Sequence, residues 1–90
     1  EFMAKATERT DVDLSGWAPG TRMFSTDDDQ HFVVDADLED YGHLRVVRRS
    51  TVILYCTETA GVTDLIPDFE FDPGTSHEEA VRLAGFTLGA

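Results

Sequence analysis

Four side chains are of types that bind soft metal ions or act in cysteine–histidine catalysis: His31, His43, His77 and Cys56. No two of them stand at the spacing of zinc ligands, and a single cysteine excludes an internal disulfide and a Cys-based zinc centre. Cys56 alternates with Val52 and Leu54, which favours a small buried hydrophobe over a reactive thiol. We expect His31 on a sheet surface and His77 exposed in the first turn of a helix.

Carboxylates gather at Asp27-Asp28-Asp29 and between Asp35 and Asp40. A calcium loop beginning at Asp35 would need Gly at its sixth position and Glu at its twelfth, where Asp40 and Val46 stand. We therefore interpret both clusters as solvated acidic loops, with a cation site as the alternative. The chain also lacks a Gly-rich phosphate loop and a serine nucleophile motif. We predict no metal, no cofactor and no enzymatic activity.

The charge balance argues against several classes of partner. The 90 residues include 18 Asp and Glu against 7 Lys and Arg, which gives a net charge of −11. Direct DNA or RNA binding needs clusters of Lys and Arg, and anionic membranes attract basic segments. The longest apolar run, from Val52 to Cys56, is far below the ~20 residues of a membrane-spanning helix. We expect no direct nucleic-acid binding, no membrane, and a cytoplasmic location.

Two groups of residues are candidates for contact with a partner protein. The basic group consists of Arg45, Arg48 and Arg49, which either balance the neighbouring acidic loop or bind carboxylates of a partner. The apolar group consists of Trp17, Val47, Ile53 and Tyr55. These side chains either pack within the domain or belong to an exposed apolar patch, and such a patch usually marks an interface.

Runs rich in β-branched and aromatic residues predict strands at residues 21–25, 31–35, 43–48, 51–56 and 62–66, with an edge segment at 69–71. The first two strands form a hairpin with the three aspartates at its tip. We place a loop at 36–42, a bend at 48–50 and a turn at 58–61. The strand at 51–56 is apolar on both faces, with Ile53 and Tyr55 sharing one of them.

The last element is a helix of about nine residues with readable ends. Ser76 with Glu79 forms a capping box, to which Thr75 with Glu78 is the alternative. Gly85 fits the left-handed position after the helix, and a Schellman motif there predicts contact between Phe86 and Val81. A helix this short must pack on the sheet to be stable.

These elements predict an α+β fold: a small antiparallel sheet of four or five strands with one C-terminal helix on one face. We interpret Glu1-Phe2 as a cloning scar, residues 3–15 as a flexible N-terminal arm, and residues 16–90 as one domain. Val12 and Leu14 give the arm a short strand-like alternation. One helix covers one face only, so we expect the face with Ile53 and Tyr55 to be open to a partner.

Two stretches, GWAPGTRMFSTDD at residues 16–28 and PGTSHEEAVRLAGF at residues 73–86, resemble small proteins encoded by actinobacterial phages. The resemblance covers most of the chain after the arm. It implies a viral product that acts inside a bacterium or in the phage particle, and it implies no functional residues.

We predict a non-enzymatic protein-interaction module that binds itself, as a homo-oligomer, or a bacterial host protein. One alternative is an acidic mimic of DNA that inhibits a host nucleic-acid-binding protein, because the charge of −11 is large for 90 residues. Such mimicry needs carboxylates strung along one surface, whereas here they gather in loops. A minor structural component of the phage particle is the other alternative.

Overall fold

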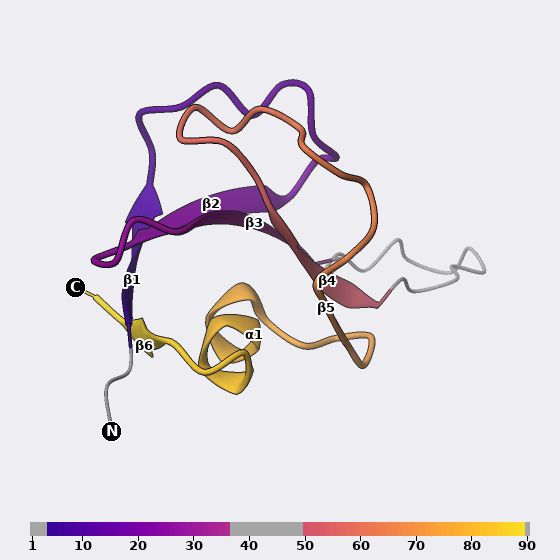
Figure 1. Cartoon of the computed structure of the whole chain (residues 1–90). Coiled ribbons are helices and arrows are strands. Elements are labelled where there is room, and N and C mark those ends of the chain that lie inside the picture. Colours follow the sequence, from indigo (N-terminus) through magenta and orange to yellow (C-terminus); the bar gives the residue numbers. More distant parts are fainter. Residues whose placement is uncertain (1–3, 37–49, 90) are drawn as a thin grey trace.

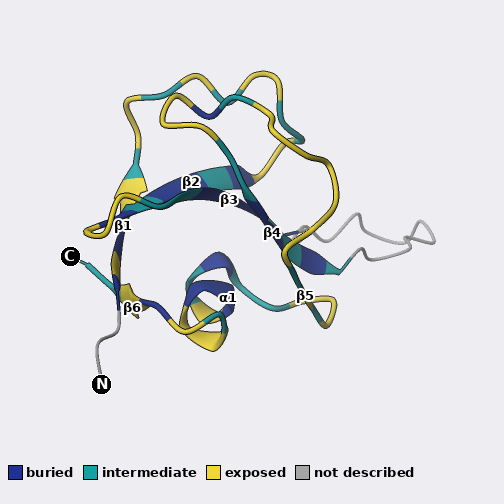
Figure 2. Ribbon diagram, in the orientation of Figure 1, coloured by how far each residue is buried: buried dark blue, intermediate teal, exposed yellow. Residues whose placement is uncertain are grey.

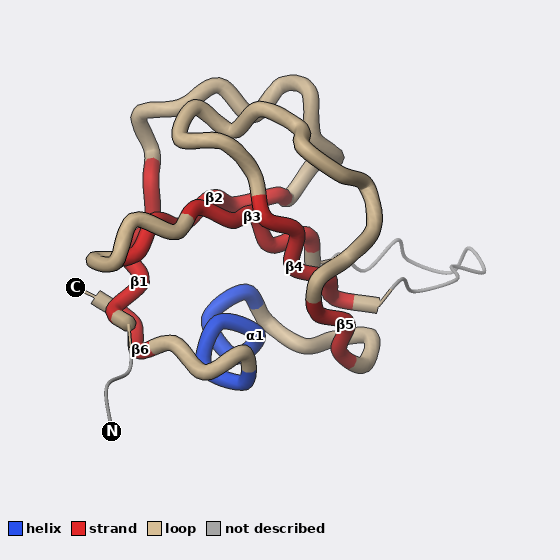
Figure 3. Tube along the Cα trace, in the orientation of Figure 1, coloured by secondary structure: helices blue, strands red, loops and turns tan. Residues whose placement is uncertain are grey.

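The structure is a computed structural model that describes residues 4–36 and 50–89. Its elements in chain order are β1 (Lys5–Arg9), β2 (Thr21–Thr26), β3 (His31–Asp35), β4 (Thr51–Tyr55), β5 (Phe69–Phe71), α1 (His77–Leu83) and β6 (Thr87–Leu88). The six strands form one curled sheet in the order β5-β4-β3-β2-β1-β6, and α1 lies inside the curl (Figures 1 and 3). The sheet is mixed, because β6 runs parallel to β1 while all other neighbours are antiparallel.

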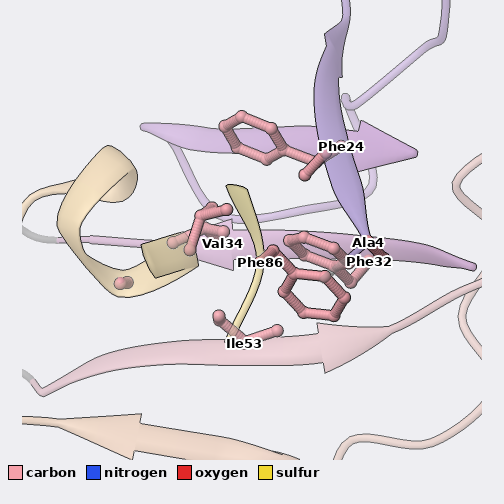
Figure 4. Packing of buried hydrophobic residues seen from close by; sticks show 9 residues of the cluster. Ala4, Phe24, Phe32, Val34, Ile53 and Phe86 are labelled. Carbon is pink, nitrogen blue, oxygen red and sulfur yellow. The ribbon is translucent and has the colours of Figure 1, made fainter. Parts of the chain in front are cut away.

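The concave face of the sheet packs on α1 around the ring of Phe32. Its ring centroid lies 4.9 Å from that of Phe86, 5.7 Å from Phe24 and 6.2 Å from Tyr55. Val34 and Ile53 lie on the same side of the sheet (Figure 4), Ala4 and Ala6 add to it at the first strand, and α1 contributes Ala80 and Val81. We call this set the helix-side core.

The opposite face of the sheet is covered by two long loops, residues 10–20 and 56–68, which arch over it together (Figures 1 and 2). Met23, Val33 and Leu54 point from three neighbouring strands into this second cluster. The loops add Ala60, Val12, Leu14 and Trp17 to it. The central strands β2, β3 and β4 are therefore covered on both faces by the described chain.

The ends of α1 follow the sequence-based prediction. Ser76 is the N-cap, and its Oγ accepts the backbone N–H of Glu79 at 3.1 Å. At the other end Gly85 has φ +100°, and its N–H donates to Arg82 O while Phe86 N–H donates to Val81 O. These two bonds are the Schellman motif. The helix has seven residues rather than nine, because Ala84 is already its C-cap.

The α+β class is confirmed, but the expected four or five antiparallel strands are too few, since the described residues form a mixed sheet of six. The expected flexible arm at 3–15 does not hold for β1, which pairs with both β2 and β6. Alanine and lysine are weak strand formers, so the buried positions Ala4 and Ala6 carried no strand signal. The expected start of the domain at residue 16 is accordingly too late.

The predicted strand at 62–66 is also wrong. Only one isolated bridge, Cys56 to Val62, remains of the expected hairpin. Further pairing is replaced by side chains, because Thr63 Oγ1 donates to Tyr55 O and Asp68 Oδ2 accepts the Tyr55 N–H. The edge segment at 69–71 is confirmed as β5. The expected strand at 43–48, and most of the loop at 36–42 and of the bend at 48–50, fall on residues outside the described part.

Candidate functional site

Ile53 and Tyr55 do not lie on an open face. They point toward α1, and Ile53 is 0% exposed within the helix-side core, while Tyr55 packs against its edge. The alternation of residues correctly placed the two on one face of β4, but that face is the one that the helix covers. The expectation that the face with Ile53 and Tyr55 is open to a partner is therefore wrong.

Trp17 has a structural role in the described fold. Its indole N–H donates to Ala60 O at 2.8 Å, and its ring packs on the second cluster. This bond joins the 10–20 loop to the 56–68 loop, so Trp17 connects the two loops that pack on this face of the sheet. The other partner-binding candidates, Val47, Arg45 and Arg49, lie outside the described residues.

The exposed aliphatic side chains of the described residues gather mainly on the 56–68 loop. Leu65 is 73% exposed, Ile66 71% and Val62 54%. We call these three residues the aliphatic patch. The expected strand at 62–66 did not predict it. Asp64 was the available signal, because strand alternation would have placed its carboxylate on the same face as Val62 and Ile66.

Hydrogen bonds hold the loop that carries the aliphatic patch. Its first half closes as a turn in which Thr57 N–H donates to Gly61 O, Gly61 N–H donates to Thr57 Oγ1, and Ala60 N–H donates to Thr57 O. Its second half is held by Asp64 Oδ1, which accepts Ile66 N–H at 3.0 Å, and by Asp68 N–H, which donates to Ile53 O. The aliphatic patch is thus presented on a preformed backbone.

A hydrogen-bonded cluster of polar side chains lies beside the β2–β3 hairpin tip. Arg9 Nη1 donates to Ser25 Oγ at 3.1 Å, Ser25 Oγ lies 2.7 Å from His31 Nδ1, and His31 Nε2 lies 3.3 Å from Asp29 Oδ1. The order of these contacts is that of a serine–histidine–acid relay. Asp29, however, is 95% exposed, and a solvated carboxylate orients and polarises an imidazole weakly. The cluster connects β1, β2 and β3.

Another polar cluster, around Arg22, lies on the face of the sheet that packs on α1. Arg22 contacts Glu8 at 2.6 Å and Glu78 at 3.1 Å, and its guanidinium lies over the ring of Phe24. The hydrogen bond from Arg22 lowers the pKa of Glu8. His77 is buried rather than exposed as expected, and its Nε2–H donates to Gly20 O at 2.6 Å. These contacts fasten α1 to β1 and β2.

The remaining candidate ligands are dispersed. Within residues 4–36 and 50–89 no three His, Cys, Asp or Glu side chains converge on a common point. At the hairpin tip the Asp28 carboxylate accepts Thr26 Oγ1–H and the Gln30 side-chain amide, and the bond from Thr26 lowers its pKa. Cys56 is partly buried beside the second cluster, and this burial raises the pKa of its thiol.

Comparison with known proteins identifies a family. A family model described as a family of unknown function (DUF7572) matches residues 5–87. No curated protein and no solved structure matches the chain. In the described part of the chain, no helix has the length and apolar character to cross a membrane.

Proposed function

Since the chain belongs to DUF7572, a family of unknown function, we propose its function from its own surface: a non-enzymatic protein-interaction module that meets its partner through the aliphatic patch. The observation that carries the proposal is the exposure of Leu65 and Ile66, at 73% and 71%, on a loop fixed by hydrogen bonds. Full burial of each side chain by a partner would contribute about 1.5–3 kcal/mol.

Preorganisation of the loop supports this proposal. A partner that binds a mobile loop must offset the entropy of ordering it, whereas the 56–68 loop is already fastened to β4 and to Trp17. Three aliphatic side chains are too few for a whole interface, which buries roughly 800 Å² on each partner. They suit its apolar centre, with Thr63, Asp64 and Glu58 in the polar rim.

The Ser25–His31–Asp29 cluster is the strongest alternative to a non-enzymatic role. The guanidinium of Arg9 occupies one acceptor site of Ser25 Oγ, and the solvated Asp29 leaves His31 without a fixed acid partner. We therefore expect no covalent labelling of Ser25 by a fluorophosphonate probe at neutral pH, as measured by intact mass. Stoichiometric labelling that Ser25→Ala abolishes would overturn the non-enzymatic part of the proposal.

The resemblance to phage proteins suggests the cytoplasm of an infected bacterium, or the phage particle, as the place of action.

The test of function is quantitative capture from a lysate of such a host. We expect Leu65→Asn with Ile66→Asn to abolish capture of a specific protein that the parent chain retains. Leu83→Asn is the matched control, because Leu83 is 60% exposed on α1. Equal capture by all three chains would contradict the proposal, and analytical ultracentrifugation tests self-association in parallel.

The acidic mimic of DNA is a second candidate, supported by the net charge of −11. It differs from the first in what binding depends on. A mimic would bind equally well with Leu65→Asn. Its affinity would fall steeply with added salt, because its carboxylates would take the place of DNA phosphates on the partner's basic surface. The same capture experiment, repeated at increasing sodium chloride concentration, separates the two.

A further inference from the structure

The stretch of chain that carries the aliphatic patch has charge of one sign. Arg9, which interacts electrostatically with Glu58, is itself paired with Asp11. Residues 50–76 contain no Lys, Arg or His, whereas Glu58, Asp64, Asp68, Glu70 and Asp72 all lie in this stretch and all are exposed. The patch sits in the middle of it. Two copies of the chain that met patch to patch would bring these carboxylates face to face, which is unfavourable.

We infer that the partner presents an apolar groove or helix face flanked by Lys and Arg, so that it is a basic amphipathic surface rather than a second copy of this chain. This inference rests on the proposed function and names the chemistry of the partner. The aliphatic patch supplies the apolar contact, and the exposed carboxylates between Glu58 and Asp72 select the sign of the partner's charge.

Asp64 is the residue that joins the two contributions. It lies between Val62 and Leu65 in the chain, and its Oδ1 accepts the Ile66 N–H at 3.0 Å, which fixes the carboxylate next to the aliphatic patch. An ionised carboxylate accepts about four hydrogen bonds, so this one bond leaves it able to accept from a Lys or Arg of the partner. Asparagine at this position would keep the bond to Ile66 and remove the charge.

The experiment uses the full chain and three model peptides that form amphipathic helices. Their apolar faces are identical rows of Leu, and their polar faces carry Lys, Gln or Glu. Binding is followed by NMR shifts of the 15N-labelled protein, which also locate the bound peptide. We expect saturable binding of the Leu/Lys peptide with shifts centred on residues 57–68, weaker binding of the Leu/Gln peptide, and none of the Leu/Glu peptide.

Two pairs of variants separate the contributions. Leu65→Asn with Ile66→Asn should weaken Leu/Lys binding at least tenfold, whereas Leu83→Asn should leave it unchanged. Asp64→Asn should weaken it about two- to fivefold, the equivalent of one exposed ion pair. Glu79→Gln, which removes the same unit of charge on α1 across the sheet, should not. Folding of each variant is checked by Trp17 fluorescence.

The possible results divide cleanly. Equal binding of the Leu/Lys and Leu/Gln peptides at the aliphatic patch overturns the basic partner and leaves the proposed function standing. Two results would overturn both the basic partner and the proposed function. One is Leu/Lys binding that Leu65→Asn with Ile66→Asn leaves unchanged, and the other is NMR shifts centred outside residues 57–68. Absence of saturable binding of all three peptides at millimolar concentration also contradicts the inference, and the lysate capture then decides the proposed function by itself.

Discussion

At the scale of single residues, one buried and several partly exposed polar side chains connect α1 to the sheet. His77 is buried and donates from Nε2 to the Gly20 carbonyl, so this side chain reaches from the first turn of α1 to the beginning of β2. The Arg22 guanidinium makes the parallel connection from β2 to both Glu8 and Glu78. Both contacts join residues far apart in sequence.

The bond from His77 leads to a stability prediction. We expect His77→Phe to lower the free energy of unfolding by about 1–2 kcal/mol, because the Gly20 carbonyl loses its partner while the volume of the ring is kept. Urea denaturation followed by Trp17 fluorescence measures the change. Glu79→Gln, in the same turn but exposed, is the control and should stay within about 0.5 kcal/mol of the parent chain.

The contact between Arg22 and Glu8 makes stability depend on pH. Because Arg22 lowers the pKa of Glu8 below its ordinary 4.5, the unfolded state binds this proton more readily than the folded state. The stabilising contribution is therefore complete above pH 4.5 and is lost as the pH falls through the folded-state pKa.

Arg22→Gln should raise the pKa of Glu8 toward 4.5 in an NMR titration of its side-chain carboxyl. It should also reduce the loss of stability between about pH 6 and about pH 3, which bracket the ordinary glutamate pKa of 4.5. An unchanged pKa for Glu8 would show that the bond does not persist in solution.

At the scale of elements, the structure separates what local sequence determines from what it does not. The β2–β3 hairpin and both ends of α1 were predictable, because turn residues, Ser76 and Gly85 act on their immediate neighbours. The side of the sheet on which α1 packs was not, because β4 is apolar on both faces and either face satisfies its pattern. β1 was missed because its one buried residue, Ala6, is an alanine. The aliphatic patch was missed because side chains of the 56–68 loop replace strand pairing.

Gly85 provides a clean test of the helix end. Its φ of +100° is a conformation that L-residues rarely adopt, and a Cβ there would meet no heavy atom within 4 Å. The cost of Gly85→Ala is therefore backbone strain alone, which we expect to be about 1–2 kcal/mol. Urea denaturation measures it. A neutral substitution would indicate that α1 ends differently in solution, and Ala84→Gly serves as the comparison at the preceding position.

At the scale of the whole molecule, the two ends of the described chain meet in the sheet. β1 and β6 are parallel neighbours, with Thr87 N–H donating to Ala4 O and Gly89 N–H donating to Ala6 O. Phe86, just before β6, stacks on Phe32 in the centre of the helix-side core. The first strand therefore holds the last segment of the chain against the core, and through it α1.

Removal of β1 distinguishes this arrangement from a flexible arm. We expect a chain that begins at Thr10 to lose cooperative unfolding, because Ala4 and Ala6 leave the helix-side core and β6 loses its only neighbour among the described strands. The loss would approach the 5–15 kcal/mol total stability typical of domains. Circular dichroism during thermal unfolding is the measurement, and a chain that begins at Met3 is the control. A flexible arm would instead leave the melting temperature of the shortened chain unchanged, and that result would place β1 outside the folded domain.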